Sequence, residues 1–244
     1  MDGVTHVINL TGAGVADGRW TTARKKKIID SRMQSTLLLQ EMITKTKTVK
    51  TFIAGTAVGY YGSRGDEWLT EEHDPGTGFL ADVVKLWEDS IDAQQLAREG
   101  VRVSIIRTGI VLATTGGALP KMILPLKGLI SPYFGQGQQW YSWIHLQDIC
   151  RIFLHCLQSS DCKGIYNGVA PQPSQQKNFA QALIKASNKP ALLIPSPTFG
   201  IKLALGEMSA TVLDSTRCTS SKIEQSGFEF QFAQLDEALE DLLD

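Results

Sequence analysis

The sequence predicts an α/β fold in which helices cover both faces of a parallel sheet. Short apolar runs rich in β-branched residues alternate with long helical segments through the first half of the 244-residue chain. The composition, 43% hydrophobic and 20% charged, is that of an ordinary globular protein. A chain of this length forms one or two domains and can bury a sizeable core.

The first half is predicted to run strand, helix, strand, helix, strand. We expect strands at residues 5–10, 50–54 and 101–107, because each is a short apolar run bounded by turn or polar residues. Residues 21–44 and 79–99 have apolar side chains at helical spacing, and we expect one long helix in each. Right-handed crossovers would join the parallel strands.

The second half is less regular and predicts smaller elements. Residues 116–137 are expected to form a loop with a short helix. The other segments expected there are strands at 141–145, 165–169 and 192–194, and helices at 147–157, 177–187, 199–212 and 235–243.

Charge and cysteine usage restrict the classes of partner. The chain has 24 basic and 25 acidic residues and a net charge of −1, so we expect no nucleic-acid partner. No apolar run approaches the roughly 18 residues that a membrane span needs, so we expect no membrane partner. The four cysteines form no Cys-x-x-Cys pair and no metal site is expected. These features, with no signal peptide at the start, predict a cytoplasmic protein.

Six short segments carry a resemblance because they occur in one order along the chain. Together they resemble the extended short-chain dehydrogenase/reductase superfamily, and more closely its atypical NAD-dependent epimerase/dehydratase branch, the YfcH-like proteins. The likeness covers essentially the whole chain. The segments are Asn9–Gly12, Gly18–Thr21, Asp30–Arg32, Thr56–Gly62, Arg107–Leu112 and Ser142–Asp148.

This resemblance implies a Rossmann-like doubly wound sheet with a small α+β C-terminal substrate lobe. Residues 1–113 would form a partial NAD(P)-binding domain. Residues 114–244 would form mainly the substrate lobe, with the segment near 140–170 returning to the sheet. The implied function is that of an NAD(P)-dependent epimerase or reductase acting on a small molecule similar to a nucleotide sugar, with NADP or NAD as cofactor.

The glycine-rich turn that usually receives the pyrophosphate is not found in the chain. Gly12-Ala13-Gly14 follows the first predicted strand, but it lacks the G-x-G-x-x-G spacing and a strong helix start. We therefore expect the sheet to be N-terminally truncated, with residues 5–12 as an inner strand and the chain starting about 50 residues late. Truncation would leave one strand of the sheet without a neighbour, and an unpaired strand edge favours poor solubility or a homodimer.

Two segments are candidates for binding the cofactor. By the resemblance, Asn9, Leu10, Thr11 and Gly12 would border the adenosine and ribose side of the dinucleotide, and a plain strand-to-loop turn is the alternative. Arg107 ends a strand, where it could contact a phosphate or ribose, and Gly109 follows it; a surface ion pair is the alternative for Arg107.

Three residues are candidate catalytic groups. Thr56 matches the hydroxyl that hydrogen-bonds the reacting substrate oxygen in the superfamily, and a turn hydroxyl is the alternative. Tyr60 and Tyr61 match the V-Y-G turn; we expect one ring to face the pocket and the other to pack, and we assign Tyr60 to catalysis and Tyr61 to substrate. Arg32 borders the apolar stripe of its helix, where the family usually has an asparagine of the catalytic relay and this branch often has arginine; an ion pair or a surface-reaching stem is the alternative.

The main departure from the family is the absence of Tyr-x-x-x-Lys. Four-residue spacing places that tyrosine and lysine on one helix face, but here the two positions are held by Leu80 and Val84, and neither can transfer a proton. We expect Lys85 to be a surface residue and His145 to be structural. Trp140 and Trp143 resemble the edge of the substrate pocket, with aromatic burial as the alternative.

Three interpretations of function follow from these residues. The chain is an epimerase or reductase with non-standard catalytic residues, a non-catalytic NAD(P)H-binding or scaffold protein, or a fragment that binds no dinucleotide alone. Loss of the Tyr-Lys pair while the pocket is kept favours the second interpretation more strongly than the fold alone would suggest.

Overall fold

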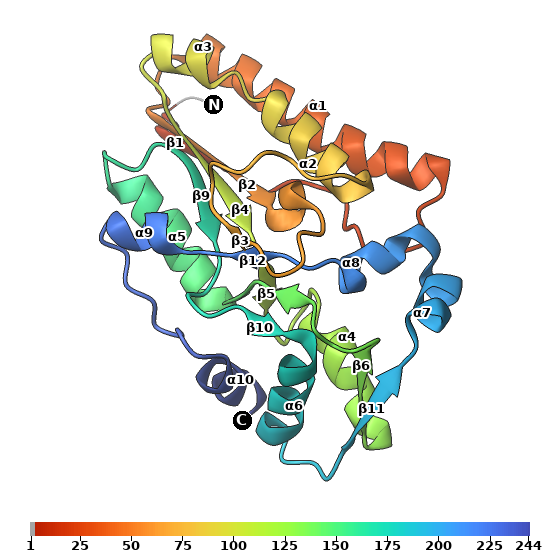
Figure 1. The fold of residues 1–244 in the computed structure, drawn as a ribbon. Helices are drawn as coiled ribbons and strands as arrows, with labels where there is room; N and C mark the ends of the chain where they lie inside the picture. The colour runs from red at the N-terminus through yellow and green to blue at the C-terminus, as the bar shows by residue number, and fades with distance from the viewer. Residues whose placement is uncertain (1–2) are drawn as a thin grey trace.

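The computed structural model describes residues 3–244 and is organised around a four-stranded parallel sheet (Figure 1). The strand order is β1 (His6–Asn9), β2 (Thr51–Ala57), β4 (Arg102–Thr108) and β9 (Gly164–Gly168). β2 is buried at nearly every position, as expected for a strand covered on both faces. The chain therefore has the α/β architecture with a parallel central sheet that the sequence predicts.

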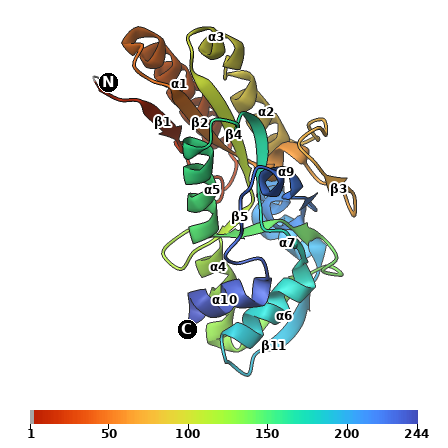
Figure 2. The same cartoon turned by 90° about the vertical axis from the view of Figure 1, so that its left-hand side faces the viewer.

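Helices cover both faces of this sheet. On one face, α1 (Thr22–Thr46) and α3 (Ala93–Arg98) contribute Ile43 and Leu96 to a core with Phe52 of β2, and α2 (Phe79–Asp89) packs beside α1. On the other face, α5 (Leu146–Gln158) and α9 (Ser221–Gln225) pack on Ile53 and Ile106. Figures 1 and 2 show the two helical layers on opposite sides of the strands.

The segment 79–99 forms two helices rather than the one that its apolar spacing predicts. α2 ends at Asp89, and α3 begins after Asp92, whose carboxylate accepts a hydrogen bond from the Gln95 amide at 2.8 Å. The Ser90 hydroxyl donates to the Trp87 carbonyl at 2.6 Å. Serine and aspartate side chains that bond nearby backbone groups favour a helix end and a new N-cap.

The second half builds a separate core below the sheet in Figure 2. Tyr141, Trp143, Phe179 and Leu239 are among its buried members. Its elements are β5 (Ile110–Leu112), α4 (Leu119–Ile123), η2 (Leu124–Gly128), β6 (Ile130–Phe134), β7 (Trp140–Tyr141), β8 (Trp143–His145), β10 (Ser174–Gln175), α6 (Gln176–Ala186), β11 (Leu192–Ser196), α7 (Thr198–Leu205), η3 (Gly206–Ser209), α8 (Ala210–Leu213) and α10 (Leu235–Leu243).

Short strands pair in twos across this half, and several were not expected. β6 lies inside the segment predicted as a loop and pairs in parallel with β11, while β5 pairs with β8 and β7 with β10. β3 (Trp68–Leu69) pairs with β12 (Arg217–Cys218). The segment 199–212 is not one helix, because Gly206 has a φ of 59° and ends α7.

No helix within residues 3–244 is long and apolar enough to cross a membrane. In the same residues, no three His, Cys, Asp or Glu side chains are grouped as metal ligands.

Candidate functional site

The predicted site residues meet at the carboxyl edge of the sheet. β1 ends at Asn9, β2 at Ala57 and β4 at Thr108, and all three strands run in the same direction. Thr56 lies beside Arg107 in the register between β2 and β4. In open α/β sheets this edge is where ligands bind.

Asn9 organises the turn that follows β1. Its side chain is buried, and its Oδ1 accepts hydrogen bonds from the backbone amide and the hydroxyl of Thr11, at 3.1 and 2.6 Å. Its Nδ2 donates to the Thr36 hydroxyl at 3.2 Å. The same hydroxyl also accepts a hydrogen bond from the Trp87 indole at 3.1 Å. The turn is therefore tied to α1 and α2, while the Leu10 side chain is left 65% exposed.

Arg32 faces this turn from α1. One guanidinium nitrogen donates to the carbonyls of Ala13 and Ile28, both at 3.0 Å, and the group lies 5.1 Å from the Trp87 ring. A Cβ at Gly12 would stand 2.9 Å from the guanidinium carbon, so the glycine allows this approach. Within residues 3–244, no carboxylate pairs with Arg32, and burial lowers its pKa. The ion-pair alternative therefore does not describe its position, and the catalytic role of this partly exposed side chain stays a prediction.

Arg107 lies inside the protein, in a bidentate ion pair with Glu88 of α2. Its Nε and Nη2 donate to the two Glu88 oxygens at 3.0 and 2.7 Å, and the two side chains are only 2% and 8% exposed. Burial disfavours the charge, but the Glu88 contacts outweigh it and raise the pKa of Arg107. The Thr56 hydroxyl donates to Glu88 Oε1, the oxygen that also accepts from Arg107 Nε, at 2.9 Å. Cofactor binding by Arg107 stays a prediction, with its guanidinium already engaged within the fold.

The two tyrosines of the turn differ in burial, and Tyr61, which the sequence assigned to substrate, is the ring that packs. It is fully buried, and its hydroxyl donates to Asn167 at 2.7 Å and accepts from Arg107 at 3.0 Å. Tyr60 is half-buried, with its ring 3.5 Å from the Arg107 guanidinium carbon. Among the described residues nothing hydrogen-bonds the Tyr60 phenol. Tyr60 is therefore the ring that keeps a hydroxyl available to a ligand.

The face of α2 that carries Tyr-x-x-x-Lys in the family is filled by apolar packing. Leu80 and Val84 lie against Gly59 of the η1 turn (Val58–Tyr61), 3.5 and 3.9 Å from where its Cβ would stand. Lys85 is exposed and pairs with Asp89 on the surface. This helix face brings no proton-transfer group to the site.

The remaining predicted residues lie in packed surroundings. Gly109 approaches the Ser142 carbonyl so closely that a Cβ would stand 2.4 Å from it. Trp143 is fully buried in the second core, and its indole donates to the Gln172 carbonyl at 2.8 Å. Trp140 is half-buried, donates to Asp66 at 2.6 Å and has Arg217 4.1 Å from its ring. Tyr61 and Trp143 thus offer no exposed surface, and their contact with substrate stays a prediction.

Glu88 was not predicted as a site residue, although the sequence carries a signal for it. Ala81, Val84 and Glu88 recur at helical spacing on one side of α2, so Glu88 continues a buried stripe. A carboxylate at such a position needs a cation, and Arg107 at the end of an apolar strand was the candidate.

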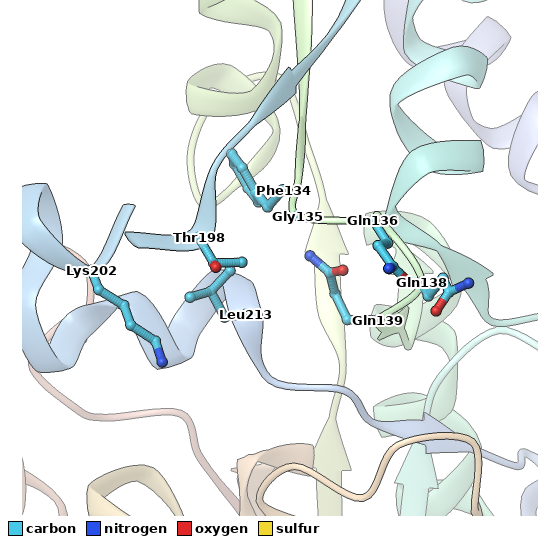
Figure 3. A pocket seen from close by; sticks show the side chains of 8 residues that line it. All are labelled: Phe134, Gly135, Gln136, Gln138, Gln139, Thr198, Lys202 and Leu213. Atoms are coloured by element: carbon cyan, nitrogen blue, oxygen red, sulfur yellow. The ribbon is translucent and has the colours of Figure 1, made fainter. Parts of the chain in front are cut away.

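A cavity of about 880 Å³ opens beside this edge, where the first half meets the second. Its walls come from residues 14–17, β5, the 114–118 loop, α4, β6, α6 and α8. A smaller pocket of about 270 Å³ shares Phe134 with it. Figure 3 shows this second pocket between β6, the turn after it, α7 and α8, lined by Gln136, Gln138, Gln139 and Lys202.

Comparison with known proteins gives the site a family context. The model of the NAD dependent epimerase/dehydratase family matches residues 1–167, and a domain of unknown function, DUF1731, matches residues 196–242. The epimerase family protein SA0724 of Staphylococcus aureus is 39% identical over 97% of this chain and 78% of its own length. The chain belongs to the NAD dependent epimerase/dehydratase family. The match to the family model and the S. aureus relative confirm the resemblance that the six segments indicated.

Solved structures agree with this assignment. Human epimerase family protein SDR39U1 (isoform 2), solved with NADPH, is 26% identical with a TM-score of 0.92, over 100% of this epimerase-family chain and 83% of the human one. A nucleoside-diphosphate sugar epimerase of Corynebacterium glutamicum is 28% identical with a TM-score of 0.78, over 99% of this chain and 46% of that one. The Rossmann-like architecture is therefore that of the family.

Proposed function

We propose that this chain binds NADPH or NADH at the carboxyl edge of the sheet and acts as an epimerase- or reductase-like enzyme. The observation that carries the proposal is Arg32, a partly buried cation against the Gly12 backbone with no carboxylate partner among residues 3–244. A desolvated cation is costly unless an anion compensates it. Family membership and the NADPH in the human relative support a dinucleotide as the source of that anion.

The residues around Arg32 fit such a ligand. Arg32 would contact a phosphate or ribose oxygen, and the Asn9–Gly12 turn offers a backbone that a ligand can approach closely. The bound nicotinamide would supply the hydride that an epimerase or a reductase exchanges with its substrate. The chain's own contribution is to bind, to orient and to hold a proton at a defined atom.

Tyr60 is the candidate for the residue that holds this proton, on its phenol oxygen. Its phenol is unengaged among the described residues, and its ring is held over Arg107. Thr56 has its hydroxyl proton directed at Glu88, so towards a substrate it can act only as an acceptor. Glu88 and Arg107 therefore act as positioning residues that hold Thr56 and Tyr60 beside the carboxyl edge.

A non-catalytic NAD(P)H-binding protein is the second candidate. The observation that favours it is the α2 face, where Leu80 and Val84 pack on Gly59 at the positions of the missing tyrosine and lysine. In this case Tyr60 would contact the ligand without exchanging a proton.

Calorimetric titration with NADPH and NADH tests binding, and carbonyl-dependent oxidation of NADPH tests turnover. We expect Arg32→Gln to weaken binding about tenfold, because it removes a charge-assisted hydrogen bond. Lys45→Gln, which removes a cation that pairs with Glu41 at the far end of α1, should leave binding unchanged. Tyr60→Phe should keep binding and lose turnover. Absence of binding to either dinucleotide would overturn the proposal, and binding without any turnover would select the second candidate.

A further inference from the structure

The large cavity beside the carboxyl edge has walls of one chemical character. Ile110, Val111, Met122, Phe134, Phe179 and Leu183 are among the residues that line it. These residues lie on β5, α4, β6 and α6, so four elements present apolar side chains to one space. Its volume, about 880 Å³, falls within the range of small-molecule pockets.

Most polar side chains in these walls, those of the 114–115 loop excepted, are already engaged with the protein. The Ser131 hydroxyl donates to the Ala180 carbonyl at 3.1 Å, and the Tyr141 hydroxyl to the Val212 carbonyl at 2.8 Å. The Gln176 amide donates to the Pro132 carbonyl at 3.3 Å and accepts from the Phe134 amide at 2.9 Å. Thr211 donates to the Met208 carbonyl at 2.7 Å. Few hydrogen-bonding groups are therefore left for a ligand inside the cavity.

The free polar groups lie towards the solvent-exposed loop. Thr114 and Thr115 are exposed, and neither makes a side-chain hydrogen bond within residues 3–244. Lys121 is the single cation among the lining residues of the described chain, and its ammonium donates to the Ala16 carbonyl at 2.9 Å. Asp17, the lining carboxylate, pairs with Arg24.

This lining does not match a nucleoside diphosphate. A diphosphate carries two or more negative charges, and burying them requires guanidinium groups, several cations or a helix N-terminus with free amides. No arginine lines the cavity in the described residues, and the one lysine is at the exposed side with a backbone partner. The first amides of α6 donate to the Gln139 and Gly137 carbonyls, and α4 has Pro120, which has no amide hydrogen, in its first turn. The cavity is large enough for a sugar nucleotide, so its volume does not select the ligand class. The apolar walls do, because they favour a ligand without charge.

We propose that this cavity binds an uncharged, largely apolar small molecule, with a single hydroxyl or carbonyl near Thr114 and Thr115, rather than a sugar nucleotide. The proposal rests on the proposed function, because it names the substrate class of that enzyme. Arg32, Thr56 and Tyr60 do not line the cavity, and the link to the cofactor edge is residues 14–17, which follow the Asn9–Gly12 turn and form one wall. Its driving force would be removal of apolar surface from water on both the ligand and the walls.

Titration with Nile red, an uncharged apolar dye whose fluorescence rises in apolar surroundings, tests the proposal on the full chain. We expect saturable enhancement and no displacement by millimolar UDP-glucose. Met122→Arg, which brings a charge into the lining from a half-buried position, should weaken dye binding at least tenfold. Met122→Leu should preserve it, and Gln138→Ala, in the adjacent smaller pocket, should leave it unchanged.

Each contrary result overturns the proposal. These results are absence of saturable dye binding, displacement by UDP-glucose, and unchanged affinity in Met122→Arg, which would place the dye elsewhere. Circular dichroism checks that the variant folds; if it does not, Thr115→Trp, which narrows the cavity from the exposed loop, replaces it and should weaken dye binding at least tenfold. NADPH binding is measured separately: dye binding without NADPH binding would sink the proposed function alone, and NADPH binding without dye binding would sink this inference alone.

Discussion

Glu88 and Arg107 form an ion pair that water hardly reaches, and this sets the cost of changing either residue. We predict that Glu88→Gln destabilises the protein by about 3–5 kcal/mol, because it leaves a buried guanidinium without its carboxylate. Urea unfolding followed by circular dichroism measures the loss. Asp89→Asn, which breaks the exposed pair with Lys85 on the same helix, should cost less than about 1 kcal/mol.

A second residue-scale consequence separates charge from geometry in this pair. Arg107→Met in the Glu88→Gln background should recover part of the lost stability, since the uncompensated charge is then removed. Equal losses for Glu88→Gln and Asp89→Asn would show that the pair is as solvated as a surface one. Thr56, which donates to Glu88, would be mispositioned in Glu88→Gln, so NADPH-dependent turnover should fall in parallel.

His145 couples stability to pH. Its side chain is buried, its Nδ1 accepts from the Gln147 amide at 3.1 Å as the cap of α5, and its ring stacks on Phe232. Burial lowers the pKa of His145 and outweighs the opposite effect of Asp241 and Asp148. The unfolded chain therefore takes up a proton before the folded one does, so this histidine stabilises the fold above its ordinary pKa of 6.5 and ceases to do so as pH falls through the folded pKa.

We predict that the free energy of unfolding falls as pH drops below about 6.5, and that His145→Asn reduces this dependence. Asparagine keeps an N-cap acceptor and removes the titrating group. Urea unfolding at pH 7.5, 6.5 and 5.5 makes the comparison. A variant with the same slope as the wild type would exclude His145 as the source.

At the scale of elements, the contact between the β4–β5 junction and the segment joining β7 to β8 depends on the absence of a side chain. We predict that Gly109→Ala destabilises the protein by about 1–3 kcal/mol, because its Cβ would meet the Ser142 carbonyl at 2.4 Å and force backbone movement. Gly116→Ala is the matched control, since no atom lies within 4 Å of its Cβ position. Thermal unfolding measures both, and equal midpoints would contradict the prediction.

The sheet and its flanking helices could be predicted because their signals are local. The strands at 6–9, 51–57 and 102–108 lie within a few residues of the apolar runs that predicted them. β6 was missed because Pro132 and its glycine-rich surroundings indicate a loop, and only pairing with β11 makes the segment a strand. The break at residues 90–92 was missed because the apolar spacing continues through it and the Asp92 cap was overlooked.

The site was predictable in part for the same reason. Sequence order placed Asn9, Thr56 and Tyr60 at strand ends, and a parallel sheet brings such ends together. The burial of Tyr61 and Trp143 and the pairing of Arg107 with Glu88 depend on contacts between residues 19 or more positions apart, to Glu88, Gln172 and Asn167. Such contacts leave no local pattern, so side-chain roles were harder to assign than positions.

At the scale of the whole molecule, β1 pairs only with β2 among the described strands and so presents a free edge. Ile8 and Leu10 next to this edge, and Leu37 and Leu38 on α1, are all exposed. An apolar sheet edge favours pairing with another chain.

We therefore predict self-association through β1, seen by light scattering as a mass that rises with concentration. Ile8→Lys should lower that mass, because a charge on an edge strand opposes pairing, whereas Leu203→Lys, at an exposed apolar position on α7, should not. A monomer at every concentration would show that the β1 edge is protected, and an equal effect of both variants would place the association on another surface.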